Sequence, residues 1–226
     1  MATHTRKLRV IELFAGAGGG SLAAKWIKGW RTICYVEWAK YPASVIAARI
    51  ADGWLTDAPI WDNVRTFDGR PWAGYADVVS AGFPCQPFSV AGKRSAGNDL
   101  RNGWPDTIRI VGEAQPRYVW LENVPGLLSA NSTYCECGAN SWEKWRGFWR
   151  VPEYANTYCS RCKRPLDKTN ENTFWYYGTV LRDLAALGYD ARWGVLSASR
   201  CGAPHKRERV WIAATLSNAH GKQTDL

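Results

Sequence analysis

One cysteine stands between two prolines, in a stretch whose residue types suit nucleophilic chemistry. Residues 82–89 read Gly-Phe-Pro-Cys-Gln-Pro-Phe-Ser, which places Cys85 between the prolines. A thiol becomes a strong nucleophile when nearby positive charge lowers its pKa, and Lys93, Arg94 and Arg101 follow closely. The prolines favour a reactive thiol on a stiff loop, because proline fixes φ and cannot continue a strand. The alternative is a buried cysteine that packs as a small hydrophobe.

A carboxyl group is expected at the same place in the fold. The apolar run 76–81, before Cys85, and the run 118–121, before Glu122, both predict buried parallel strands. Ligand crevices of α/β sheets lie at the carboxyl ends of such strands, so Glu122 should face the crevice that holds Cys85. There a carboxyl group can donate a proton to a ring nitrogen. The alternative is an acid that interacts with a helix dipole, but convergence with Cys85 favours chemistry.

A glycine-rich turn, residues 15–20, follows the first predicted strand. Glycines let the backbone approach a ligand closely, and the helix start that follows offers free N–H groups. Glu37 ends the next predicted strand, 32–36, where an acid can accept hydrogen bonds from ribose hydroxyls, and Trp38 offers a flat face for adenine. No Lys-Ser or Lys-Thr pair follows the glycines, which favours an adenosine-containing cofactor without a triphosphate. The alternative is a tight turn beside a surface acid.

The elements that must position these residues alternate along the chain. Residues 8–14 read as the first strand. Helices are predicted over residues 21–28, 42–51, 104–114 and 174–187. The last two strands, over 189–196 and 209–215, are expected to pair as a hairpin. This alternation predicts a doubly wound α/β sheet, and no internal repeat is visible.

The composition is that of an ordinary globular protein, with 46% hydrophobic and 22% charged residues among 226. That length is sufficient for one good core. No apolar run approaches membrane-spanning length, and the N-terminus does not read as a signal peptide, so no membrane partner is expected. The net charge of +9 suits a polyanionic partner, although many basic proteins never bind nucleic acid. Seven cysteines, an odd number, favour a reducing cytoplasm over a disulfide framework.

The regular pattern breaks down over residues 131–172, a polar and aromatic insertion that carries two close cysteine pairs. Such pairs are consistent with a tetrahedral zinc site that braces a loop without a core of its own. The four candidate ligands are Cys135, Cys137, Cys159 and Cys162. The alternative is four unliganded cysteines, and the Trp and Arg residues of the insertion could also contact DNA. Cys34 and Cys201 are expected only to fill space.

In order along the chain, these motifs resemble those of the DNA cytosine-5 methyltransferases. Residues 11–19 resemble the family's S-adenosylmethionine loop, and residues 37–38 its ribose and adenine contacts. Residues 82–89 resemble the nucleophile motif, 122–124 the acid motif and 202–210 the basic motif. The resemblance covers about residues 7–130 and 174–215, and it implies a Rossmann-like methyltransferase sheet. Five motifs in register are far more specific than any one of them.

The resemblance implies a set of site residues and a division of the chain. The catalytic residues are Cys85, Glu122 and Arg207, with Arg209 in support. The cofactor-binding residues are Phe14, Ala15, Gly16, Ala17, Gly18, Gly19, Glu37, Trp38, Asp62, Asn63, Pro84 and Trp104. The substrate-binding residues are Gln86, Ser89, Arg101, Asn123 and His205. Residues 1–130 form the cofactor-binding and catalytic part, 131–172 the insertion, 173–216 the remainder of the methyltransferase domain and 217–226 a polar tail.

The implied reaction transfers a methyl group from S-adenosylmethionine to C5 of cytosine in double-stranded DNA. The Cys85 thiolate adds to C6, which makes C5 nucleophilic. Glu122 protonates or hydrogen-bonds N3 and the exocyclic amine, and Arg207 neutralises charge around the base and phosphate. A base then removes the C5 proton and the thiol leaves. The target atom cannot be reached inside a duplex, so the cytosine must be flipped out.

Some positions depart from the family's pattern. His205 stands where the family usually has glutamine, and Arg101-Asn102-Gly103 replaces the usual Arg-Gly pair. The family has an acid that contacts the adenine amino group at about this position, and either Asp62 or Asn63 can take that role. Trp104 occupies an apolar position that faces the cofactor in the family.

The family's target-recognition region and its final helix have no counterpart before Leu226. The chain is therefore expected to be one subunit of a split enzyme, a fragment or an unusually small member, with weak or absent activity alone and a second subunit as a possible partner. A noncatalytic DNA- or partner-binding remnant is the alternative function. RNA methylation is less favoured, because Pro84-Cys85 with Glu122 follows the DNA pattern. The expected location is the cytoplasm of a bacterial or phage-infected cell, at the nucleoid.

Overall fold

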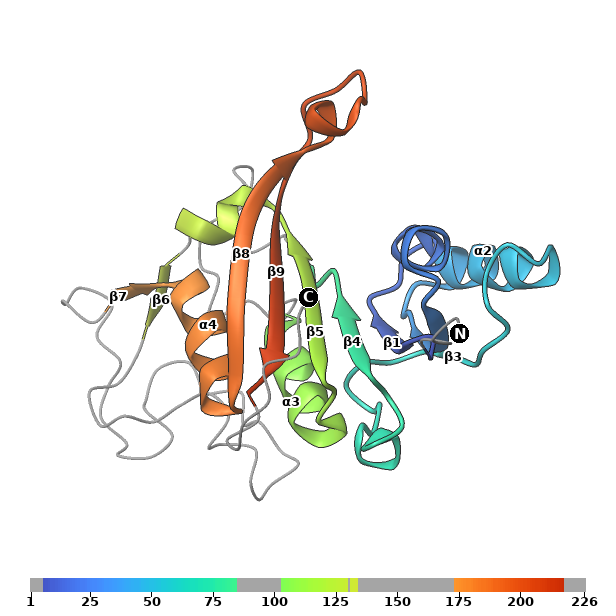
Figure 1. Ribbon diagram of the computed structural model, residues 1–226, viewed down its shortest axis with the longest axis horizontal. Coiled ribbons are helices and arrows are strands. Elements are labelled where there is room, and N and C mark those ends of the chain that lie inside the picture. The colour runs from blue at the N-terminus through green and yellow to red at the C-terminus, as the bar shows by residue number, and fades with distance from the viewer. Residues whose placement is uncertain (1–5, 85–102, 130, 134–172, 218–226) are drawn as a thin grey trace, which may run out of the picture.

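The structure is a computed structural model that describes residues 6–84, 103–129, 131–133 and 173–217. Its framework is a seven-stranded sheet with the order β3-β2-β1-β4-β5-β9-β8 (Figure 1). The strands are β1 (Arg9–Leu13), β2 (Arg31–Val36), β3 (Ile60–Trp61), β4 (Val78–Ala81), β5 (Tyr118–Asn123), β8 (Tyr189–Ser197) and β9 (Glu208–Leu216). The first five pair in parallel, whereas β9 is antiparallel to both β5 and β8. The predicted α/β sheet is confirmed, in a mixed form.

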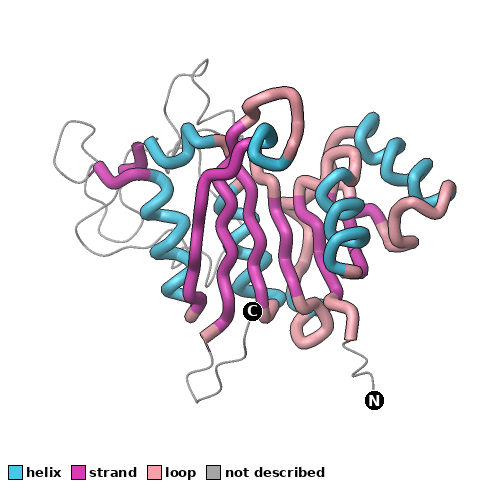
Figure 2. Tube along the Cα trace, turned by 45° about the horizontal axis from the view of Figure 1, so that its top comes forward, coloured by secondary structure: helices cyan, strands magenta, loops and turns pink. Residues whose placement is uncertain are grey.

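Helices cover both faces of the sheet (Figure 2). α3 (Trp104–Ala114) and α4 (Tyr176–Ala186) pack on one face, where Ile108 and Leu184 join the same buried cluster as Leu13 of β1. α1 (Gly19–Ala23) and α2 (Lys40–Ala51) lie on the other face, where Tyr35 of β2 packs with Ile46 of α2. None of the described helices is long and apolar enough to cross a membrane.

α3 shows how the sequence selects a helix with one buried face. Its buried residues recur at helical spacing: Trp104, Thr107, Ile108, Ile110, Val111 and Ala114. Pro105 lies in the first turn, where its missing N–H costs no bond within the helix. Gln115 ends the helix in the left-handed region, at φ 44°. The predicted bounds, 104–114, are those observed.

The helix predicted over residues 21–28 takes a different form. α1 ends at Ala23, and the chain continues as a π-helical turn, η1 (Ala24–Lys28). Lys25 Nζ donates hydrogen bonds to the carbonyls of Gly53 and Trp54, at 3.1 and 2.8 Å. This tie to the loop after α2 holds the wider turn, a geometry that propensity alone does not reveal.

The predicted insertion starts and returns at one place. After the 3-10 helix η4 (Pro125–Ser129), strand β6 (Asn131–Thr133) pairs antiparallel with β7 (Thr173–Trp175), directly before α4. The chain between these two strands, including Cys135, Cys137, Cys159 and Cys162, lies outside the described residues. The two-stranded sheet therefore closes the base of the excursion.

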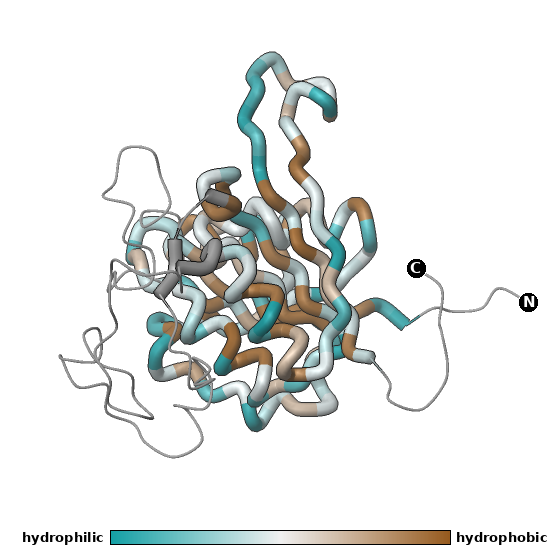
Figure 3. Tube along the Cα trace, turned by 90° about the vertical axis from the view of Figure 1, so that its left-hand side faces the viewer, coloured by the Kyte–Doolittle hydropathy of each residue, from teal (hydrophilic) through white to brown (hydrophobic). Residues whose placement is uncertain are grey.

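β8 and β9 form an arm, residues 189–216, that projects past the end of β5 (Figure 1). The short 3-10 helix η6 (Ala198–Cys201) stands at its tip, and hydrophilic residues gather toward that end (Figure 3). Cys201 is exposed there, so the prediction that it only fills space is wrong: the tip lies beyond any core. Cys34 is buried in β2 as expected, and burial raises the pKa of its thiol to about 12.

Candidate active site

The turn after β1 has an open side and a packed side. Phe14, Gly16 and Gly18 all have left-handed backbones, with φ of 54°, 55° and 81°. A Cβ on Gly16 or Gly19 would meet nothing within 4 Å, whereas one on Gly18 would lie 2.6 Å from Leu55. Phe14 is the unusual member, because a non-glycine residue rarely adopts this conformation and such strain often marks functional sites. The turn therefore leaves room for a ligand at Gly16 and Gly19.

Glu37 joins this turn to the end of β2. Its Oε2 accepts a hydrogen bond from the Gly16 backbone N–H at 2.7 Å, and its Oε1 accepts one from Ala39 at 2.8 Å. Each carboxylate oxygen keeps a further lone pair for another donor. Trp38 is 75% exposed beside it. The structure thus brings together the predicted glycine turn, ribose acid and adenine platform.

Asp62 and Asn63 follow β3, next to Glu37, whose N–H donates to Trp61 O at 2.9 Å. The side-chain oxygen of Asn63 accepts from the Arg65 N–H at 3.0 Å, so it is engaged within its own turn. Asp62 is exposed. The sequence left either residue as the adenine contact; of the two, Asp62 has the exposed side chain.

Three predicted segments meet near Pro84. A Cβ on Gly103 would lie 2.7 Å from the Phe14 ring and 2.8 Å from Pro84 Cδ, so only glycine fits there. Trp104 is 1% exposed and packs against Phe83, with ring centroids 5.6 Å apart. Its indole N–H donates to the Asp183 carboxylate at 2.9 Å. The structure therefore places Trp104 in the wall behind the site.

Glu122 and Arg209 form an ion pair at the next strand ends. Arg209 Nε lies 2.6 Å from Glu122 Oε1, and both side chains are partly exposed. Glu122 Oε2 would lie 3.5 Å from a Cβ on Gly82, the first residue of the predicted nucleophile stretch. The predicted acid and its supporting arginine are therefore neighbours beside the start of that stretch. Cys85 itself, with Gln86, Ser89 and Arg101, lies outside the described residues.

Asn123 is buried at the end of β5 and bonds the backbone that leads toward Cys85. It is 2% exposed, its amide donates to Phe83 O at 3.2 Å and its oxygen accepts from the Val124 N–H at 2.8 Å. These contacts fix the backbone two residues before Cys85, so in this arrangement Asn123 faces the loop, not a substrate.

His205 and Arg207 are exposed where the arm returns toward β9. Arg207 has a left-handed backbone, φ 31°, and its carbonyl accepts a 3.2 Å hydrogen bond from the Ala198 N–H across the arm. This bond holds the turn that carries both side chains, while Arg209, two residues on, reaches Glu122.

Sequence reasoning missed one buried acid below the glycine turn. Glu12, the last residue but one of β1, is 7% exposed, and burial raises its pKa to about 7 although the Ser80 and Ser21 hydroxyls partly offset this. A Cβ on Gly20 would lie 2.7 Å from Glu12 Oε1, so glycine is required where α1 crosses the carboxyl group. The available signal was an acid inside the apolar run Val10–Phe14.

Glu12→Gln should reduce the loss of stability that accompanies rising pH. Between the ordinary pKa of 4.5 and about 7, the folded state keeps a proton that the unfolded chain has released, so stability falls as pH rises and levels off above 7. Glutamine removes this dependence, which amounts to about 3 kcal/mol at about 1.4 kcal/mol per pKa unit. Urea unfolding at pH 5 and pH 8 measures it. Equal pH dependence in both proteins would contradict the burial of a protonated Glu12.

Comparison with known proteins assigns the chain to a family. Residues 8–143 and 164–225 match the family described as C-5 cytosine-specific DNA methylase. Among similar proteins, the type II methyltransferase M.BsuFI of Bacillus subtilis is 31% identical over 207 residues, which cover 91% of this chain and 39% of the relative. M.HhaI of Haemophilus parahaemolyticus is 36% identical over 126 residues, 54% of this chain and 35% of the relative.

Solved structures share the fold. DNMT2 of Spodoptera frugiperda has a TM-score of 0.58 at 18% identity, covering 94% of this chain and 51% of its own. The methyltransferase EhMeth of Entamoeba histolytica has a TM-score of 0.60 at 14% identity, covering 97% and 56%. The chain spans 39% to 50% of the length of three curated relatives that match over about 90% of it. With the family match covering most of its residues, the chain belongs to the C-5 cytosine-specific DNA methylase family.

Proposed function

We propose that this chain is the cofactor-binding and catalytic part of an enzyme that methylates C5 of cytosine in double-stranded DNA. The observation that carries the proposal is the Glu122–Arg209 pair beside Gly82, at the same sheet edge as the contact between Gly16 and Glu37. An acid and an arginine suited to a base, on β5 and β9, and a glycine turn and an acid suited to a nucleoside, after β1 and β2, thus lie at one edge of the sheet with β4 between them.

The residues at the first of these places fit S-adenosylmethionine. The turn is open where a Cβ on Gly16 or Gly19 would stand, Glu37 can accept from ribose hydroxyls, and Trp38 exposes an aromatic face. Asp62 is the acceptor for the adenine amino group. When bound, S-adenosylmethionine supplies an electrophilic methyl group on a sulfonium.

The chain's own residues prepare the cytosine to accept that group. The Cys85 thiolate forms a bond to C6, and the electron pair of the C5–C6 double bond becomes available at C5. Glu122, held by Arg209, hydrogen-bonds or protonates N3 and the exocyclic amine, and Arg207 offsets charge near the base and phosphate. After C5 is methylated, a base removes its proton and the C6–S bond breaks, which restores the ring and the thiolate. The cytosine must be flipped from the duplex for this chemistry.

Glu37→Gln tests the cofactor half of this proposal. Glutamine presents an N–H₂ group to one of the two backbone N–H donors, from Gly16 and Ala39, so the side chain cannot keep both contacts. The affinity for S-adenosylhomocysteine, measured by calorimetry, should fall about tenfold to 100-fold. Asp52→Asn is the matched control, because Asp52 is a surface acid paired with Arg49. No binding by the unaltered chain would overturn the proposed function itself.

We also propose that full activity needs a further part, corresponding to the portion of the longer relatives that this chain does not match. The chain spans 39% to 50% of the length of two such relatives, so the target-recognition region that the family resemblance implies has room outside it. A second subunit or a further segment would supply it, and the 226 residues alone would methylate weakly. The alternative, a noncatalytic binding remnant, would bind cofactor or DNA without transferring a methyl group.

The four cysteines of the insertion form a separate proposal. The family match omits residues 144–163, which include Cys159 and Cys162, whereas Cys135 and Cys137 fall inside the matched range. Among the described residues, no group of His, Cys, Asp or Glu could hold a metal ion. We expect about one zinc per chain, lost with strong chelators and with Cys159→Ser. Metal analysis that finds no zinc in freshly purified protein would remove the idea.

A further inference from the structure

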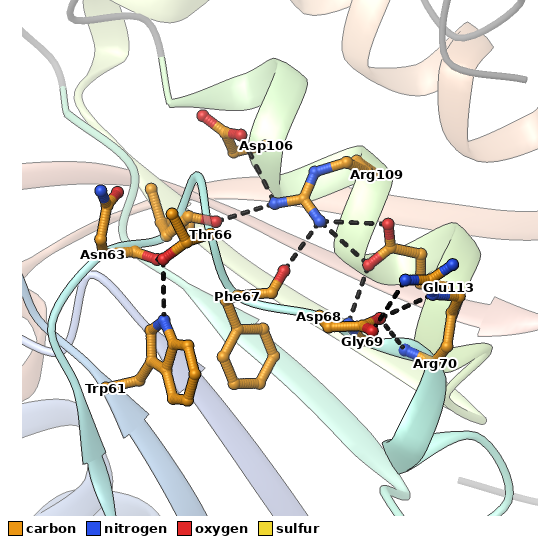
Figure 4. A network of polar contacts seen from close by, with 11 residues as sticks. Trp61, Asn63, Thr66, Phe67, Asp68, Gly69, Arg70, Asp106, Arg109 and Glu113 are labelled. Carbon is orange, nitrogen blue, oxygen red and sulfur yellow. Dashed lines mark hydrogen bonds and ion pairs between the residues drawn. The ribbon is translucent and has the colours of Figure 1, made fainter. Parts of the chain in front are cut away.

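Arg109, in the second turn of α3, is buried against a segment far away in the sequence (Figure 4). Its side chain is 7% exposed. Nη2 donates to the carbonyl of Val64 and Nη1 to that of Phe67, both at 2.8 Å. One guanidinium group therefore fixes two carbonyls of the chain that follows β3.

Two carboxylates of α3 hold the guanidinium in place. Glu113 accepts from Nη1 at 2.9 and 3.1 Å, and Asp106 lies 3.5 Å from Nη2. Glu113 Oε2 also accepts from the Gly69 N–H at 2.8 Å, which adds a third point of attachment to the same segment. A planar fork of five donors can serve these partners together, whereas a lysine ammonium cannot reach both carbonyls and both carboxylates.

The attached segment, residues 62–69, is held by these contacts and by the burial of the Phe67 side chain in the core. It contains no regular helix or strand. Its own bonds form one tight turn, in which the Asn63 carbonyl accepts from Thr66 and Phe67 at 3.1 Å. A Cβ on Gly69 would lie 2.9 Å from Glu113 Cβ, so the segment runs as close to α3 as backbone allows. Arg109 thus anchors the turn that begins directly after Asp62.

We propose that Arg109 is a positioning residue for the cofactor site, which holds the 62–69 segment against α3 so that Asp62 meets the adenine amino group. This inference rests on the proposed function, because it assigns Asp62 to adenine. Arg109 acts through the backbone of Val64 and Phe67 and does not itself reach the ligand. The same helix begins at Trp104, beside Phe14 and Pro84, so one rigid element supports both the adenine side and the wall of the site.

Arg109→Lys tests the proposal through the chemistry of the ligand. It should weaken binding of S-adenosylhomocysteine about tenfold, through loss of buried hydrogen bonds. The same substitution should lower the affinity for an S-adenosylhomocysteine analogue whose purine lacks the 6-amino group by less than twofold. The double variant Arg109→Lys, Asp62→Ala should bind S-adenosylhomocysteine no more weakly than the weaker of the two single variants. Both substitutions remove the same contact, the one between Asp62 and the adenine amino group. Hydrogen exchange at the Thr66 and Phe67 amides should accelerate, since their bonds to Asn63 lose support.

Arg49→Lys is the matched control, because the Arg49 side chain also pairs with an acid three residues away but is about half exposed, and that acid, Asp52, lies at the end of the same helix. If Arg109→Lys does not fold, Glu113→Gln provides the milder change, with a smaller loss of the same ligand selectivity. Equal weakening of both ligands, or a lower melting temperature with unchanged affinity, would overturn the positioning role. If the unaltered chain binds neither ligand, the proposed function fails as well. Binding of both ligands by the unaltered chain with no difference between them would overturn only the role of Asp62 and Arg109.

Discussion

Cys85→Ala should abolish covalent capture of a duplex that carries 5-fluorocytosine, with at least a thousandfold loss of the rate. The C6–S bond cannot form without the thiol, and fluorine at C5 cannot leave as the proton does, so the adduct persists in the unaltered chain. Denaturing electrophoresis with S-adenosylmethionine present measures the captured fraction. Capture needs only one turnover, so it reports on a chain whose activity alone is weak.

The matched control is Cys201→Ala, which removes an exposed cysteine at the tip of the arm. It should leave capture unchanged. Affinity for S-adenosylhomocysteine should stay within twofold in both variants, because neither cysteine is among the residues assigned to the cofactor. Capture by Cys85→Ala at the normal rate would assign the nucleophile to another residue.

Glu122→Gln should slow the same capture about 100-fold to 10,000-fold. Glutamine keeps the shape of the side chain but cannot give a proton to N3, and general acid catalysis contributes effects of that size. Arg209→Lys should cost less, because lysine keeps the charge near Glu122 but lacks the short Nε contact. Single-turnover rates for each variant and for the pair show whether the two act together.

A nonadditive double variant is expected, since Arg209 acts by holding Glu122. Affinity for S-adenosylhomocysteine should again change less than twofold. A Glu122→Gln protein that captures the base at the normal rate would show that the acid beside Gly82 has a structural role only.

Much of the framework could be predicted because local patterns determine it. The apolar runs of β1 and β4 lead into glycine-containing loops, and that of β5 ends at Glu122 and Asn123. α3 has both helical spacing and an early proline, so the bounds of these elements were close to those observed. β3 was missed, because a two-residue strand has no periodicity to detect. The π-helical turn after α1 depends on Lys25 reaching Gly53 and Trp54, a contact that local sequence does not encode.

The site divides in the same way. The neighbourhood of Glu122 and Gly82 followed from the rule that parallel strands end at one edge. Arg109 could not be found from its helix alone: Asp106 and Glu113 lie at visible helical spacing, but its carbonyl partners are 42 and 45 residues away. Asn63 and Asp62 are equivalent candidates in the sequence, which does not reveal that the Asn63 side chain bonds the Arg65 N–H within its own turn. The nucleophile Cys85 stays a prediction, since it lies outside the described residues.

The most direct measurement locates the bond itself. The chain is incubated with S-adenosylmethionine and a 5-fluorocytosine duplex, digested with protease and nuclease, and the linked peptide is sequenced by mass spectrometry. We predict a methylated fluorocytosine nucleotide attached to the sulfur of Cys85. A nucleotide attached elsewhere, or no linked peptide from a chain shown to bind both cofactor and DNA, would contradict the proposed mechanism.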